Sequence, residues 1–220
     1  MTMITNAANT YVVKGIREDL SDTIFNISPV ETPLVSNAGK RKVSNTYFEW
    51  QTDVLTTAIT TNYQLEGDVI AASAIDATSR VGNYTQIMDK RFAITGTSEA
   101  VTKAGRKSEI AYQTAKKGKE LKRDMEAAFT SSQVAVAGGT GTARRTACFD
   151  AWLTSNTDNA NTNGEYTYTT TPITARTTGT LRTFTETILK SIIKDQWTNG
   201  GEPKILMVGP VNKQRVSGFV

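Results

Sequence analysis

The chain has 220 residues, of which 38% are hydrophobic and 21% are charged, so it can bury the core of one or two soluble domains. Its formal net charge is +4, and the basic residues are interleaved with acidic ones, which is not the charge distribution of a nucleic-acid-binding surface. The sequence has no histidine and a single cysteine, Cys148, which excludes Ser-His-Asp triads, structural zinc sites and intrachain disulfides, and we expect this thiol to be buried and inert.

The N-terminal region carries no targeting signal that we recognise. It lacks the basic start and apolar core of a signal peptide, and no later apolar run reaches the roughly 18 residues of a membrane-spanning helix. We therefore expect synthesis inside the cell and no membrane partner. A short amphipathic helix ending at Pro29 is predicted by apolar residues at helical spacing, namely Ile16, Leu20, Ile24 and Ile27. The stretch that follows, up to Gly39, is predicted to be an arm with a turn at its end rather than part of the core.

Two segments with alternating side chains predict the strands of one long hairpin. They cover residues 46–55 and residues 82–95. The connection between them, residues 56–81, is small, polar and far longer than a tight turn, so we expect an extended two-stranded flap that leaves the body.

Two features of this hairpin could also indicate a binding site, one for calcium and one for nucleic-acid bases. Glu66 and Asp68 lie in the connection, but the surrounding sequence lacks the spacing of a calcium-binding loop, and solvated acids are the simpler interpretation. An aromatic cluster could stack nucleic-acid bases, although cross-strand packing explains it better; its members are Tyr47, Phe48, Trp50 and Tyr84.

The strongest local signal predicts a long amphipathic helix over residues 108–133, with Ser108 as its N-cap. Its apolar stripe is formed by Ala111, Ala115, Gly118, Leu121, Met125 and Phe129. Its opposite face is charged and carries Lys116, Lys117, Lys119, Glu120, Lys122, Arg123, Asp124 and Glu126. Exposure to solvent is the simplest interpretation of the charged face, and contact with an acidic surface of a neighbouring subunit is the alternative.

The C-terminal third predicts a small α/β domain. Residues 156–179 are rich in Thr and Asn and predict a surface loop. Thr183 and Glu186 have capping-box spacing at the start of a second amphipathic helix, which should end at residues 199–201. Residues 204–208 form a short apolar run that is typical of a strand covered on both faces. An arm, a flap, a long helix and such a domain, each with exposed surface, suit a subunit of an assembly better than a free-standing catalyst.

Five segments of the sequence resemble tailed-bacteriophage major capsid proteins with the Hong Kong 97 fold. They read GIREDLSDTIFNISPVETPL (15–34), NTYFEWQTD (45–53), VGNYTQI (81–87), EAVTKAGRKSEIAYQTAKKGKELKRDMEAA (99–128) and PKILMVGPVNKQRVSGF (203–219). The resemblance implies an α+β fold with four parts: an N-terminal arm (1–44), an extended β-hairpin loop (45–96), a peripheral domain with its spine helix (97–150) and the start of an axial domain (151–220). Family members continue beyond this point, so a truncated subunit is expected.

The resemblance also implies a function. We expect a structural protein without enzymatic activity or cofactor, which assembles in the host cytoplasm into pentamers and hexamers of an icosahedral virion shell around double-stranded DNA. Decoration, scaffolding and portal proteins are further expected partners. Contacts between subunits are expected at Ile16, Leu20, Ile24, Ile27, Glu66, Asp68, Lys116, Lys119 and Arg123. The alternative is another phage structural or nucleic-acid-binding protein, either a tail protein or a head accessory protein.

Overall fold

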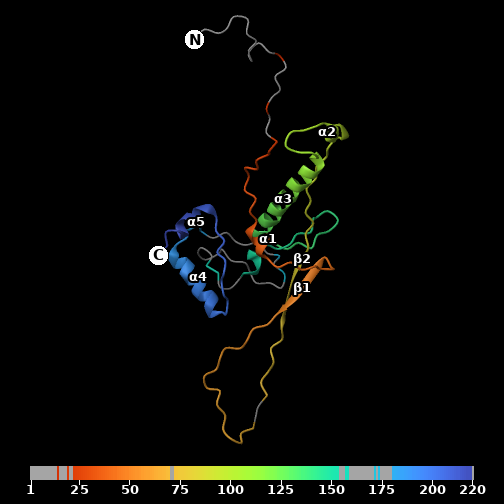
Figure 1. Cartoon of the computed structure of the whole chain (residues 1–220). Coiled ribbons are helices and arrows are strands. Elements are labelled where there is room, and N and C mark those ends of the chain that lie inside the picture. Colours follow the sequence, from red (N-terminus) through yellow and green to blue (C-terminus); the bar gives the residue numbers. More distant parts are fainter. Residues whose placement is uncertain are drawn as a thin grey trace. The chain divides into compact units, whose positions relative to one another are not determined.

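The computed structural model describes residues 14, 19, 22–69, 72–153, 157–158, 171, 173 and 180–219. Within this part of the chain, the elements in order are α1 (Pro33–Asn37), β1 (Tyr47–Thr52), β2 (Ser79–Tyr84), α2 (Gly96–Ala100), α3 (Glu109–Thr130), a 3-10 turn (Asp150–Trp152), α4 (Glu186–Thr198) and α5 (Pro210–Val216) (Figure 1). The fold is therefore mixed α+β, as predicted. The chain divides into two compact units, Met1–Val30 with Lys90–Leu121 and Glu31–Asp89 with Lys122–Val220.

Helix α3 confirms the strongest sequence prediction. It begins at the predicted cap, because the Ser108 hydroxyl accepts a hydrogen bond from the amide of Ala111 at 3.1 Å. The apolar stripe is less buried than expected, however, since Met125 and Phe129 are only half-buried and Ala111 is exposed. The apolar side of α3 is therefore incompletely covered by the described residues.

The arm does not form the predicted amphipathic helix where it is described. Residues 22–30 contain no helix, and the side chains of Ile24 and Ile27 are 41% and 96% exposed. A helix this short is marginal in water unless its apolar face packs against something, and Ile27 has no such surface here. Ile16 and Leu20, the other two members of the predicted stripe, lie outside the described residues.

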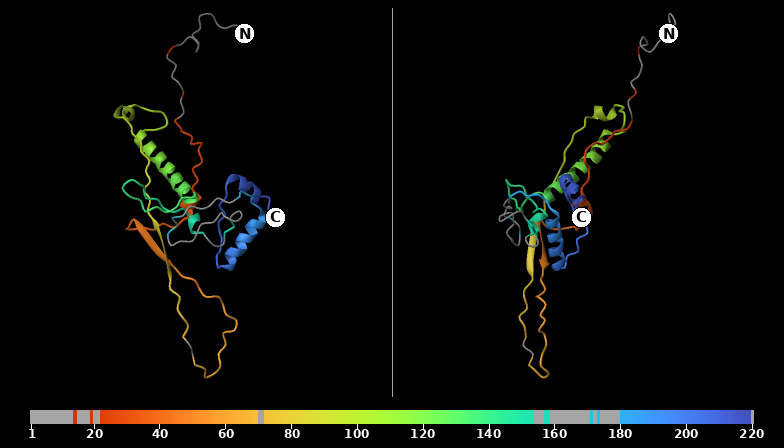
Figure 2. Two further views of the ribbon diagram at one scale, coloured as in Figure 1. Left: turned by 180° about the vertical axis from the view of Figure 1, so that it is seen from behind. Right: turned by 90° about the vertical axis from the view of Figure 1, so that its left-hand side faces the viewer.

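Strands β1 and β2 confirm the predicted hairpin but shift its second strand. They pair antiparallel from Tyr47 opposite Tyr84 to Thr52 opposite Ser79. Residues 85–95, predicted to continue the strand, are not part of the sheet. The connection consequently spans residues 53–78, and its described residues leave the strands as a long loop, as both views of Figure 2 show.

The base of this hairpin packs on a small core in the second unit. The buried members of that core are Ala135, Ala147, Cys148 and Ala151, and Tyr84, Val134 and Trp152 pack against them. Cys148 is completely buried, as predicted. The chain reverses within this region at residues 140–141, where Gly139 and Thr142 form one bridge and Val136 and Arg145 form a second. Gly138, just before this turn, has a φ of 78°, which favours glycine.

Helix α1 was not predicted, and it corrects the interpretation of the stretch up to Gly39 as an arm outside the core, because part of this stretch is packed. Thr32 and Val35 are buried, each with 8% of its surface exposed. The Glu126 carboxylate accepts hydrogen bonds from the amides of Leu34 and Val35, both at 2.8 Å. Glu126 therefore does not belong to a purely solvated face of α3, because it caps the start of α1.

The C-terminal helix is confirmed, and the strand expected after it is not. Helix α4 is capped by Thr185, whose hydroxyl accepts from the amide of Ile188 at 3.5 Å, instead of by the predicted Thr183. Residues 204–208 belong to no strand, and all except Val208 are exposed. A strand needs a neighbour to satisfy its backbone groups, and the only sheet among the described residues consists of β1 and β2.

Candidate subunit-contact surface

The loop between β1 and β2 exposes an unusual amount of apolar surface. We call residues 53–78 the flap. Among its described residues, the large apolar side chains are each at least 71% exposed and comprise Val54, Leu55, Ile59, Tyr63, Leu65, Val69 and Ile75. Soluble monomers rarely leave this many large apolar side chains in water on one segment, and such surfaces mark interaction sites. The sequence prediction of a small, polar connection therefore understated its apolar content.

The flap is also entirely acidic in its charged residues. Residues 53–78 contain the carboxylates of Asp53, Glu66, Asp68 and Asp76 and no lysine or arginine. Glu66 and Asp68 are exposed on a turn, where Gly67 has a φ of 87° and the amide of Asp68 donates to the carbonyl of Leu65 at 3.2 Å. A surface that is both apolar and negative favours a partner with apolar patches flanked by basic groups.

The end of the β1–β2 hairpin that lies away from the flap is held by polar contacts. The Asn83 side-chain oxygen accepts a hydrogen bond from the amide of Ala147 at 2.9 Å. The Gln86 side-chain oxygen accepts from the Gln133 amide group at 2.6 Å and from the backbone amide of Thr146 at 3.2 Å. Among the described residues, every buried side-chain nitrogen or oxygen has a hydrogen-bond partner. The strands are therefore fixed at their base, whereas the flap makes few contacts of its own.

The aromatic residues of the hairpin pack on one another. The rings of Tyr47 and Tyr84 pair across the strands with centroids 4.7 Å apart, and Trp50 contacts Trp152 at 4.8 Å. The Tyr47–Tyr84 contact agrees with the predicted cross-strand packing, and the Trp50–Trp152 contact joins β1 to the 3-10 turn.

Helix α3 carries the basic groups singled out in the sequence. Lys116, Lys119 and Arg123 are all exposed, while Lys117 forms an ion pair with Glu120 at 2.7 Å. That hydrogen bond, assisted by the nearby lysines, lowers the pKa of Glu120 below its usual value. The positive side chains that remain in solvent are suited to an acidic partner.

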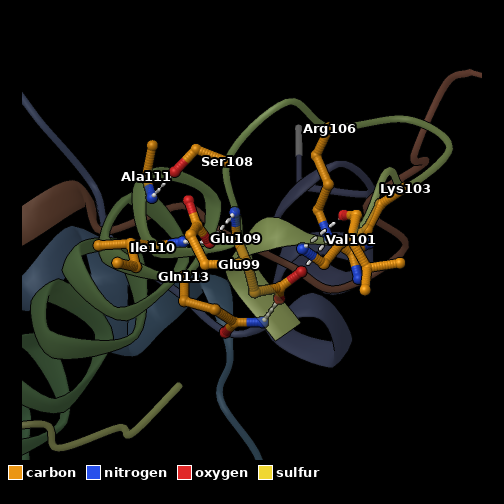
Figure 3. Close-up of polar contacts among 9 residues, drawn as sticks. All are labelled: Glu99, Val101, Lys103, Arg106, Ser108, Glu109, Ile110, Ala111 and Gln113. Atoms are coloured by element: carbon orange, nitrogen blue, oxygen red, sulfur yellow. Dashed lines mark hydrogen bonds and ion pairs between the residues drawn. The ribbon is translucent and has the colours of Figure 1, made fainter. Parts of the chain in front are cut away.

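The start of α3 is bound by a cluster of polar contacts that the sequence did not reveal (Figure 3). The Glu99 carboxylate accepts from the amides of Glu109 and Ile110 at 2.9 and 3.3 Å. Glu109 forms an ion pair with Arg106, and the Gln113 side chain donates to it at 2.8 Å. The three- and four-residue spacings around Glu109 were visible in the sequence, but the contact with Glu99 spans ten residues and left no local signal.

These hydrogen bonds favour the charged forms of both acids. The Ser108 hydroxyl, followed by the two backbone amides, lowers the pKa of Glu99. The Gln113 amide, followed by Arg106, lowers the pKa of Glu109. Both carboxylates therefore act as structural anions that hold the residues before α3 against its first turn.

Within the described ranges, no group of three or more histidine, cysteine, aspartate or glutamate residues is arranged to hold a metal ion. None of the helices in this part of the chain is both long enough and apolar enough to cross a membrane.

Comparison with known proteins gives two matches. A family model described as "SU10 major capsid protein" matches residues 3–220. The protein described as "Major capsid protein" of Escherichia phage Phieco32 is 36% identical over 123 residues. The matched region is 56% of this chain and 35% of that relative, so the chain covers about a third of the relative's length.

Proposed function

Since the chain belongs to the SU10 major capsid protein family, we propose that it is a structural subunit that assembles with copies of itself into the head shell of a tailed bacteriophage. Its role is mechanical rather than catalytic. The observation that supports this role best is the flap, whose apolar side chains remain in water on a single chain. Such a segment is stabilised only when another molecule covers it.

The finer architecture that we propose is the Hong Kong 97 fold. Residues 1–44 form the arm, residues 45–96 the extended loop, residues 97–150 the peripheral domain and residues 151–220 the start of the axial domain. The flap and the long helix α3 support this division. In this arrangement axial domains join subunits into pentamers and hexamers, and the shell encloses double-stranded DNA through contacts that do not read sequence.

We propose that the flap lies on the basic side of α3 in a neighbouring copy. Glu66 and Asp68 would then approach Lys116, Lys119 and Arg123, all of which are exposed on the single chain. Burying each large apolar side chain contributes about 1.5–3 kcal/mol, and the seven on the flap together contribute about 10–20 kcal/mol. Association of two copies costs about 4–15 kcal/mol of free energy, so a single contact between two copies is marginally stable, whereas a closed ring of such contacts is stable.

Negative-stain electron microscopy and sedimentation velocity of the purified chain test this function. The proposal predicts closed or ring-shaped particles whose formation rises steeply with protein concentration. A protein that stays monomeric at high concentration but binds duplex DNA with a strong salt dependence would instead be a nucleic-acid-binding accessory protein. The two outcomes are distinguished by repeating the sedimentation in the presence and absence of DNA.

A further inference from the structure

The Tyr47 ring on β1 lies directly over Gly82 on β2. Gly82 is buried, and a Cβ atom added to it would overlap the Oη and Cζ atoms of Tyr47 and come within 2.9 Å of the Cε2 atom. The φ of Gly82 is not positive, so glycine is needed here for the space that it leaves and not for its backbone conformation. Gly82 therefore allows a large side chain to cross the neighbouring strand at close range.

The position of the ring is fixed at the end of the hairpin that lies away from the flap. Tyr84 stands opposite Tyr47 in the sheet, and the two rings are tilted by 46° with their centroids 4.7 Å apart. Beside this pair, the amide of Thr85 donates to the carbonyl of Thr46 at 2.9 Å, and the Arg144 side chain donates to the carbonyl of Thr85 at 2.7 Å. The Tyr47 hydroxyl is consequently presented by a part of the hairpin that is itself held in place.

The Tyr47 hydroxyl forms a hydrogen bond with a residue from a distant part of the chain. Its partner is the hydroxyl of Thr171, and the two oxygens are 2.8 Å apart. Thr171 follows Tyr47 by 124 positions and belongs to the Thr- and Asn-rich stretch of residues 156–179. Thr171 also takes part in a further interaction, so the contact with Tyr47 is one of at least two that hold it.

The same stretch is held at a second described position. Asp158 forms an ion pair with Arg182, whose guanidinium also donates to the Asp158 backbone carbonyl at 2.7 Å. Arg182 lies shortly before Glu186, the first residue of α4. All of these residues belong to the second compact unit. Two described positions of the stretch are thus bound, one to the β1–β2 hairpin and the other to the segment that leads into α4.

We propose that residues 156–179 are a strap that joins the β1–β2 hairpin to the segment before α4, with Thr171 held by Tyr47 and Asp158 held by Arg182. Gly82 makes the first attachment possible, because a larger residue would push the Tyr47 hydroxyl away from Thr171. The strap holds together parts of the chain that are far apart in sequence, and it does so in the single chain without assembly.

Fluorine nuclear magnetic resonance of the full chain labelled with 3-fluorotyrosine tests the attachment at Tyr47, because a fluorine atom next to the hydroxyl senses its hydrogen bond. Tyr47→Phe identifies the Tyr47 resonance by its loss. Gly82→Ala should move this resonance toward that of Tyr63, which is 79% exposed, since the added Cβ displaces the ring. Thr171→Val removes the hydroxyl partner and should move it as well. An unchanged Tyr47 resonance in either variant would overturn the proposal.

A thermodynamic cycle measured by urea unfolding tests whether Gly82 acts through Tyr47. Gly82→Ala should raise the equilibrium constant for unfolding about tenfold, because an aromatic contact and a hydrogen bond are lost. In the Tyr47→Ala background the same change should leave the constant unchanged or lower it by up to about fivefold, because alanine suits a strand better than glycine. Gly118→Ala, whose Cβ meets open space, is the matched control and should leave the Tyr47 resonance in place. An equal increase in both backgrounds would contradict the role of Gly82.

Hydrogen exchange followed by mass spectrometry tests the strap itself. Tyr47→Phe keeps the ring but loses the hydroxyl, and it should speed exchange in peptides that contain Thr171 by about three- to tenfold. Arg182→Ala should do the same for peptides that contain Asp158. Tyr84→Phe leaves both attachments intact and should change neither rate. Wild-type exchange rates in Tyr47→Phe and Arg182→Ala would show that these contacts do not hold the stretch.

Discussion

Replacing Glu126 with alanine should detach α1 from α3. The carboxylate accepts two backbone hydrogen bonds at 2.8 Å, from Leu34 and from the buried Val35. Losing a helix cap typically costs about 0.5–2 kcal/mol, and a hydrogen bond to a charged group contributes about 1.5–3 kcal/mol. Because Glu126 is half-buried and water can replace part of the interaction, we expect a loss of about 2 kcal/mol.

The assay is unfolding followed by circular dichroism, with heat and with urea. For a chain of this size, about 2 kcal/mol corresponds to a fall in Tm of about 4–8 °C. Glu126→Gln keeps one acceptor oxygen and should lose about half as much. Lys119→Ala, on an exposed part of the same helix, should change stability by less than about 0.5 kcal/mol. If Glu126→Ala unfolds at the same temperature as the wild type, α1 is not held by this carboxylate.

Three further predictions concern pH, the flap and the apolar stripe. The folded-state pKa of Glu99 and of Glu109 lies below the ordinary value of 4.5, so the stability that these carboxylates contribute is complete above that value and is lost as the pH falls through the lower folded-state pKa. Glu109→Gln should therefore reduce the fall in Tm at acid pH. The same fall in Tm in the wild type and the variant would count against this role. Proteolysis of the isolated chain should begin in residues 53–78 and be suppressed in particles, whereas equal cleavage in both states would argue against a covered flap. Met125→Asp should destabilise the fold by about 1–3 kcal/mol, measured from the midpoint of urea unfolding, and Lys119→Ala should leave the midpoint unchanged. A Met125→Asp variant as stable as the wild type would show that the apolar stripe of α3 faces water.

Local features of the sequence predicted the elements that local interactions determine. Helix α3 was found from its apolar periodicity and from Ser108, and both operate within one or two turns. Helix α4 was found in the same way, although two threonines two residues apart competed for its cap and Thr185 was the one used. The hairpin was detected because alternation of side chains is also a local signal.

Elements that depend on distant partners were missed or misplaced. Helix α1 is capped by Glu126, which lies more than ninety residues away. Strand β2 contains Asn83, whose side chain is bound by the amide of Ala147, and no pattern within the strand specifies that contact. Residues 204–208 have the composition of a buried strand, but composition cannot supply the neighbouring strand that the prediction assumed.

The residues of the predicted contact surface divide in the same way, into those that local sequence features predicted and those that depend on distant contacts. Glu66, Asp68 and Lys119 are exposed, as expected, whereas Glu126 of the same predicted charged face is half-buried and caps α1; their contact with a neighbouring subunit stays a prediction. The pairing of Glu99 with the start of α3 and the hydrogen bond from the Gly105 amide to the Asp22 carboxylate were not anticipated. Both join segments that only the folded chain brings together.

Assembly through the flap is tested most directly by a charge exchange followed by electron microscopy and sedimentation. Glu66→Lys/Asp68→Lys should abolish particles formed by the wild-type chain, because the flap would meet the lysines of its neighbour with like charge. Adding Lys116→Glu/Lys119→Glu to the same chain should restore them, and circular dichroism should be unchanged in both variants. Normal particles from the first variant, or no recovery in the second although both fold, would contradict the proposed contact between the flap and α3.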